Sequence, residues 1–185
     1  MFEDEAGFYS KPARATTWGA VGKTPVMRIA GRGWTKINAI GTLTLSPGGR
    51  GGTRRRAGQF FKLYEQNIDG PIFAQYLTEL LRAVRGPTTM VWDGLKVHSA
   101  KEVRAVLANN PRVHVYVLPA YAPELNPVET MWANTKSVKL RGIAAEDIDD
   151  LDAKTYVALD EIGDSQQLLK SFFAGTPLII PGVAT

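Results

Sequence analysis

Three acidic side chains carry the chemistry that this sequence suggests. Asp4 lies in an alternating segment near the start of the chain, Asp93 directly follows an apolar segment, and Glu129 comes shortly after Asn126-Pro127. The chain has no cysteine, so thiolate ligands are excluded, and a cluster of carboxylates favours Mg²⁺ or Mn²⁺ over Zn²⁺. Two such ions about 4 Å apart can activate a water or a 3′-hydroxyl and stabilise the leaving oxygen of a phosphodiester.

Each of these acids also has a simpler structural explanation. Alternation puts Asp4 on the same face as Phe2 and Phe8, where a carboxylate is costly unless it is paired or bound; if the strand end frays, the acids there are merely solvated. Asp93 precedes Gly94, a pair typical of turns. Glu129 is the third residue of a helix that Asn126 would cap, which is a capping-box arrangement.

The order of the expected elements shows how the three acids could come together. Strands are predicted over residues 2–9, 35–45, 59–66, 88–93 and 113–118, with helices from 69 to 84, over 99–109 and from 127 onward. Strands 35–45 and 59–66 form a hairpin, and the apolar strand 113–118 is expected to be buried on both faces of a parallel sheet. The fold class is therefore α/β, a mixed β-sheet flanked by α-helices, with a right-handed crossover over residues 88–118.

This topology brings the acids toward one edge of the sheet. Strands 88–93 and 113–118 run parallel, so they end at the same edge, where ligands gather in such sheets. Asp93 ends the first of them, and the helix that carries Glu129 begins after the second. If strand 2–9 pairs beside them, Asp4 joins the other two acids.

Composition permits a polyanionic partner without requiring one. The 185 residues are enough for one domain, with a formal net charge of +4 and a pI of about 9.4. Arg54, Arg55 and Arg56 stand together in a Gly-rich loop, where they either contact DNA or are simply solvated. No apolar run approaches the ~20 residues that span a bilayer, and the start is no signal peptide. The lack of cysteine fits a reducing compartment without proving one, and a cytoplasmic location is expected.

Several other residues are weaker candidates. His98 is either an ordinary residue at a helix start or one that supports the site, and His114 is expected in the core. Lys96 and Lys136 are candidates for contact with DNA phosphates, with simple exposure as the alternative. Asn126 is also a candidate for supporting the site. Core packing is expected for Trp18, which could otherwise stack on a base, and for Met131 and Trp132.

Three motifs resemble one known family. They are Phe2-Glu3-Asp4-Glu5-Ala6-Gly7-Phe8, Val91-Trp92-Asp93 followed by His98, and the block from Leu118 to Glu129, LPAYAPELNPVE, with Trp132 and Lys136 after it. In this order and spacing, over roughly residues 1–140, the chain resembles the DDE transposases of bacterial insertion sequences related to the mariner group. Such a match implies a ribonuclease H-like fold. A difference from the family is Gly94, where an Asn is common.

The resemblance implies a specific activity and specific partners. Asp4, Asp93 and Glu129 would bind two Mg²⁺ ions, with Mn²⁺ as a substitute, for cleavage at transposon ends and attack of the freed 3′-hydroxyl on target DNA. The partners would be DNA and a second copy of the chain in a synaptic complex. One catalytic domain, 1–185, is expected, with a core over 1–140, a helical part over 141–185, and the family's N-terminal helix-turn-helix region absent. The alternatives are an inactive remnant that only binds DNA weakly, and an unrelated α/β binding domain.

Overall fold

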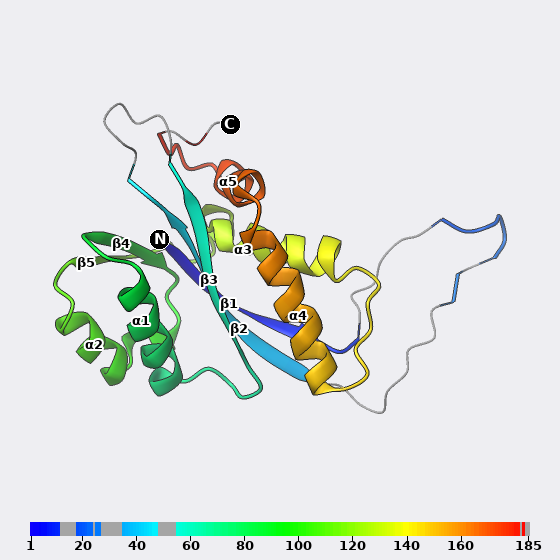
Figure 1. Cartoon of the computed structure of the whole chain (residues 1–185), viewed down its shortest axis with the longest axis horizontal. Helices are drawn as coiled ribbons and strands as arrows, with labels where there is room; N and C mark the ends of the chain where they lie inside the picture. Colours follow the sequence, from blue (N-terminus) through cyan, green and yellow to red (C-terminus); the bar gives the residue numbers. More distant parts are fainter. Residues whose placement is uncertain (12–17, 24, 27–34, 48–54, 182, 184–185) are drawn as a thin grey trace.

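A five-stranded sheet lies at the centre of the fold (Figure 1). The computed structural model describes residues 1–11, 18–23, 25–26, 35–47, 55–181 and 183. The strands are β1 (Phe2–Tyr9), β2 (Lys36–Leu45), β3 (Ala57–Tyr64), β4 (Thr88–Trp92) and β5 (Val113–Val117), in the order β3-β2-β1-β4-β5. β1, β2 and β3 are antiparallel, whereas β4 runs parallel to both β1 and β5. The predicted mixed sheet is confirmed.

Helices cover both faces of this sheet. The helices are α1 (Gly70–Ala83), α2 (Lys101–Ala108), α3 (Pro127–Asn134), α4 (Ile148–Gly163) and α5 (Gln166–Ala174), with short turns η1 (Lys96–Ser99), η2 (Pro123–Leu125) and η3 (Thr135–Lys139). Side chains of α1 and α2 share one hydrophobic cluster with β4. Those of α3, α4 and α5 share a second cluster with β1 and β2 on the other face.

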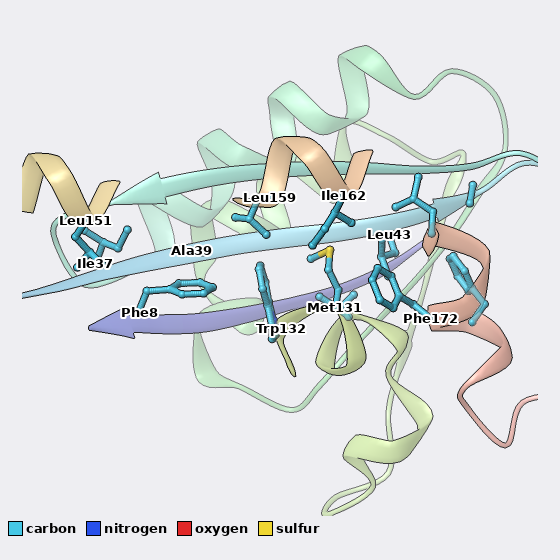
Figure 2. Close-up of a cluster of buried hydrophobic side chains, with 14 of the residues drawn as sticks. Phe8, Ile37, Ala39, Leu43, Met131, Trp132, Leu151, Leu159, Ile162 and Phe172 are labelled. Atoms are coloured by element: carbon cyan, nitrogen blue, oxygen red, sulfur yellow. The ribbon is translucent and has the colours of Figure 1, made fainter. Parts of the chain in front are cut away.

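The hydrophobic cluster on this second face packs the helices near the C-terminus against β1 (Figure 2). Trp132 packs edge-to-face on Phe8, with ring centroids 5.8 Å apart, and Leu159 and Ile162 of α4 belong to the same cluster. The helical part after residue 140 therefore packs on the same sheet as the segments that carry the acids. No helix in the described ranges is long and apolar enough to cross a membrane.

Helix α1 begins as the sequence predicts. Asp69 caps it, because an Oδ1 of its side chain accepts a hydrogen bond from the backbone N–H of Ile72 at 3.0 Å, and Pro71 lies in the first turn. Phe73 and Leu80, among other residues at helical spacing, are fully buried against the sheet. Local sequence signals and tertiary packing agree for this helix.

Two predictions about buried residues are wrong. Strand β5 is an edge strand with β4 as its neighbour, so His114 is exposed and the Tyr116 side chain is 63% exposed. A continuous apolar run is typical of a strand buried on both faces, and an edge strand such as β5 can have the same sequence pattern. Trp18, expected to pack against the sheet, is fully exposed.

Candidate active site

Strands β1 and β4 place Asp4 and Asp93 at the same level of the sheet. Phe2 pairs with Val91 in parallel register, and two further residues along each chain lead to Asp4 and Asp93. Since β4 ends at Trp92, Asp93 lies at the carboxyl edge, as predicted. Its Oδ1 accepts a hydrogen bond from Leu95 N at 2.9 Å, so the turn predicted at this position is also formed.

The carboxylate of Asp4 is hydrogen-bonded to Trp132 of α3, the helix that also carries Glu129. This carboxylate is buried and its Oδ2 accepts a hydrogen bond from Trp132 Nε1 at 3.1 Å. Gly41, the partner of Asp4 in β2, makes this contact possible, because a Cβ at this glycine would lie 2.5 Å from the indole of Trp132. The close approach of α3 to β2 thus sets the position of the donor to Asp4.

Glu129 lies in the first turn of α3, whose start is tied to β1. Buried Asn126 caps the helix by accepting from Val128 N at 3.2 Å, while its Nδ2 donates to the carbonyl of Glu3 at 3.0 Å. The backbone N–H of Asn126 donates to Pro123 O at 2.9 Å, so it is already occupied and Glu129 does not complete a capping box. The exposed side chain of Glu129 is left for another role.

The three acids influence one another electrostatically. The pKa of Asp4 is raised from 3.8 to about 8, first by burial and then by the charges of Glu129, Glu5 and Asp93. Within the described residues, however, their oxygens do not all lie within 4.8 Å of one another. The fold thus brings the three predicted acids into one neighbourhood of unbalanced negative charge, an arrangement that a divalent cation relieves.

Lys136 of η3 is a cation that interacts electrostatically with Glu129 and Asp4. A backbone hydrogen bond from Leu140 N to Thr135 O, 2.9 Å long, closes the π-type turn that carries it. The Lys136 Nζ lies 5.2 Å from the centroid of the Phe8 ring. Burial lowers the pKa of Lys136, and the nearby charges of Glu129 and Asp4 offset this only in part.

On the opposite face of β1, the structure reveals a polar cluster of two acids and a histidine that the sequence did not predict. Glu3 and Glu5 meet His98 of η1, whose Nε2 lies 3.2 Å from Glu3 Oε2 and 3.4 Å from Glu5 Oε1. The solvated alternative for the acids of this strand is therefore wrong, since Glu3 is only 1% exposed. The available signal was the alternation of β1, which puts Glu3 and Glu5 together on the face away from Asp4.

His98 links this cluster to the second acid of the site. Its ring stacks on Trp92 with centroids 4.7 Å apart, and its Nδ1 lies 3.0 Å from the carbonyl oxygen of Asp93. Burial lowers the pKa of His98, but Glu3 and Glu5 more than offset this and raise it to about 10. Of the two interpretations of His98, the one that supports the site agrees with these contacts.

The basic candidates divide into two groups. Lys96 is exposed in η1 and lines a groove with Gly94 and Glu5 beside Asp93. Arg55 and Arg56 lie at the end of the sheet away from Asp93. Arg55 Nε donates to the carbonyl of Pro181 at 2.6 Å. Arg54 lies outside the described residues.

The comparisons with solved structures agree on the fold. The chain is similar to the Mos1 transposase in its paired-end complex with the left transposon end (TM-score 0.66, 17% identity, 94% of this chain and 50% of that chain). It is also similar to the Mos1 strand transfer complex (TM-score 0.65, 17% identity, 94% and 49%) and to the mariner Mos1 paired-end complex with Mg (TM-score 0.59, 17% identity, 94% and 50%). This chain thus spans about half the length of these transposases, which share its α/β, ribonuclease H-like fold.

Sequence comparison identifies the family. A search of curated proteins found no match. The family model described as DDE superfamily endonuclease matches residues 1–152, a range that includes all three predicted acids and the His98 cluster. The chain therefore belongs to the DDE superfamily endonuclease family.

Proposed function

We propose that this chain is the catalytic domain of a DNA transposase, which cleaves phosphodiester bonds at transposon ends and joins the freed 3′-hydroxyl to target DNA. The observation that carries the proposal is the parallel pairing of β1 with β4, which brings Asp4 and Asp93 to the same level of the sheet, with Asp4 hydrogen-bonded to Trp132 of the helix that carries Glu129. Membership of an endonuclease family and the likeness in fold to Mos1 transposase support the same activity.

Asp4, Asp93 and Glu129 would hold two Mg²⁺ ions, with Mn²⁺ as a substitute. The donor set fits these ions, since it consists of carboxylate oxygens whose crowded charge raises the pKa of Asp4. Mos1 complexes with Mg and with Mn are among the similar structures. When bound, such ions supply Lewis acidity to the attacking and leaving oxygens of the phosphodiester.

The protein's own residues prepare the site. Asp4 must lose its proton before it can act as a ligand, and its pKa of about 8 makes this proton loss part of metal binding. Trp132 donates to one oxygen of Asp4 and thereby orients the other. Asn126 fixes the start of α3 on β1, and so fixes the helical turn that carries Glu129.

DNA and a second copy of the chain are the proposed partners. Lys96, exposed close to Asp93, and Lys136, close to Asp4 and Glu129, would contact the phosphates beside the scissile bond. Arg55 and Arg56 would contact DNA farther from the acids, and Arg54 is proposed as a further DNA contact from its place in the sequence alone. A homodimer would hold two transposon ends, a proposal that rests on the family resemblance; the Mos1 transposase of similar fold was solved in a paired-end complex with the left transposon end.

A plasmid-nicking assay with Mg²⁺ tests the proposal. The wild-type chain is expected to convert supercoiled plasmid to nicked circles, and Asp93→Asn to lose this activity while keeping its melting temperature within a few degrees. Asp160→Asn, at an exposed position of α4, is the matched control and should cut like wild type. Equal cutting by all three proteins would contradict the assignment of Asp93. DNA binding without cutting would instead indicate an inactive remnant.

A further inference from the structure

Glu3, Glu5 and His98 form a buried cluster with unsatisfied polar atoms. Both carboxylate oxygens of Glu3 and of Glu5, together with His98 Nε2, are inaccessible to solvent and satisfy no hydrogen-bond geometry. The side chains of Glu3 and His98 are 0% and 5% exposed. The contacts of Nε2 with the two carboxylates, at 3.2 and 3.4 Å, leave two buried acids facing one imidazole, an excess of negative charge that a bound cation would relieve.

The orientation of His98 points its second nitrogen at the carboxylates. Nδ1 lies 3.0 Å from the Asp93 carbonyl oxygen, which can only accept, so Nδ1 carries the hydrogen. A metal ion that displaces the proton from Nε2 then finds a lone pair there, facing Glu3 and Glu5. Histidines that bind metals are commonly oriented in this way, with the other ring nitrogen donating to a backbone carbonyl.

The spacing of the three side chains is that of ligands around one ion. One ligand atom from each lies within 4.8 Å of the others, and the Nε2 to oxygen distances are 3.2 and 3.4 Å. Direct charge-assisted hydrogen bonds are shorter, about 2.7–2.9 Å. Atoms bound about 2.1 Å from a common ion, at angles between octahedral and tetrahedral, are separated by roughly 3.0–3.4 Å.

We propose that Glu3, Glu5 and His98 bind one divalent cation of the kind that accepts both nitrogen and oxygen ligands, such as Mn²⁺, Co²⁺ or Zn²⁺. Two carboxylates and a neutral imidazole balance the charge of such an ion. Glu5 lines the groove that also contains Asn38 and Lys96, which offers a route from solvent. The ion would link β1 to the main chain at Asp93 through His98, and would therefore fix the position of Asp93 relative to Asp4.

The alternative is a second proton on His98, which would make direct ion pairs with the two carboxylates. Pulsed electron paramagnetic resonance of the Mn²⁺-loaded protein distinguishes the two, because a ligating imidazole couples its ¹⁴N nucleus to the metal. Asp4, Asp93 and Glu129 supply only oxygen, so the ions proposed for them give no such signal. The readout is therefore independent of DNA cleavage and of the proposed function.

The expected result is ¹⁴N coupling in the wild-type chain and in Asp93→Asn, and its loss in His98→Gln. The matched control is His114→Gln, which removes the other histidine of the chain from an exposed position on β5 and should keep the coupling. Glu5→Gln should lower the affinity of this site for Mn²⁺, measured by the ¹⁴N-coupled signal, by at least about 10-fold. Absence of ¹⁴N coupling in the wild-type chain at saturating Mn²⁺, or its loss in His114→Gln, would overturn the proposal even if His98→Gln failed to fold.

Discussion

Asp4 and Glu3 are neighbours in β1, yet the sheet places them in opposite surroundings. Asp4 faces α3, with the N–H of Trp132 as a donor and with like charges from Glu129 and Asp93 around it. Glu3 faces α1 and η1, where Glu5 is accompanied by His98. On the Asp4 face, the negative charges have no cationic side chain among their hydrogen-bond partners within the described part of the chain. On the Glu3 face, His98 provides either a nitrogen ligand for a metal or, when protonated, a positive charge.

This difference separates a site for chemistry from a site for positioning. Unbalanced charge near Asp4 destabilises the metal-free fold, and stability is commonly sacrificed in this way where function requires it. The cluster around His98 instead connects β1 to the chain at Asp93. The predictions below change one side of β1 at a time.

Asp4→Asn is expected to have the largest effect, and in opposite directions on activity and stability. Loss of a ligand should reduce cleavage by more than the roughly 10- to 100-fold typical of outer-shell changes. Asn keeps an acceptor for Trp132 but carries no charge, so the metal-free variant should be more stable than wild type at neutral pH. Plasmid nicking and thermal unfolding in EDTA measure the two effects.

The stability effect of Asp4→Asn should depend on pH in a defined direction. Asp4 has a pKa of about 8 in the folded chain against 3.8 as the ordinary value. The stability that neutral Asp4 contributes is full below about pH 4 and is lost as the pH rises through 8. The advantage of the variant should therefore grow from pH 5 to pH 8, by at most about 1.4 kcal/mol per pH unit. A constant difference would mean that Asp4 is not buried.

Asn126→Ala should destabilise the chain by about 2–4 kcal/mol and reduce cleavage. The variant loses the cap of α3, worth about 1 kcal/mol, and leaves the carbonyl of Glu3 without its donor, at a further cost of about 1–3 kcal/mol. Asp69→Ala is the matched control, because it removes the cap of α1 without touching β1. It should cost about 1 kcal/mol by chemical denaturation and leave cleavage intact.

Gly41→Ala should affect the face of Asp4 and spare the face of His98. The added methyl group would collide with the Trp132 ring, which must move and withdraw its N–H from Asp4. Such overpacking costs about 1–3 kcal/mol. Cleavage should fall while ¹⁴N coupling of bound Mn²⁺ stays; loss of both would show that the two faces are not independent.

Gly94→Asn should have the smallest effect. Nothing lies within 4 Å of a Cβ built at Gly94, and its backbone is not among the described positions with positive φ. The change introduces the Asn that is common at this position in the transposase family, and its effect on the free energy of unfolding should stay within about 0.5 kcal/mol. A larger loss, measured by thermal unfolding, would mean that the turn after Asp93 needs glycine.

Most of the fold follows from local patterns in the sequence. Alternation over residues 2–9 and helical spacing after Asp69 predict β1 and α1, because each pattern matches one backbone period. Strand β5 shows the limit. Its apolar residues specify a strand, but whether both faces are covered depends on its place at the edge of the sheet, which is a tertiary property.

The site divides in the same way. The approach of Asp93 to Asp4 follows from the rule that parallel strands end at one edge. The contact from Trp132 to Asp4 joins residues 128 positions apart. It depends on the absence of a side chain at Gly41, where a Cβ would collide with the Trp132 ring. The meeting of Glu3 and His98 depends on how α1 and η1 cover the second face. Neither contact has a local signature.

A crystal structure of the chain with Mn²⁺ tests the central claim most directly. Anomalous scattering locates the ions without reference to activity or DNA. Our account predicts an Mn²⁺ peak between the carboxylates of Asp4 and Asp93, with Glu129 turned toward the same site. Manganese absent from Asp4 at saturating concentration, with the carboxyl still held only by Trp132, would contradict it.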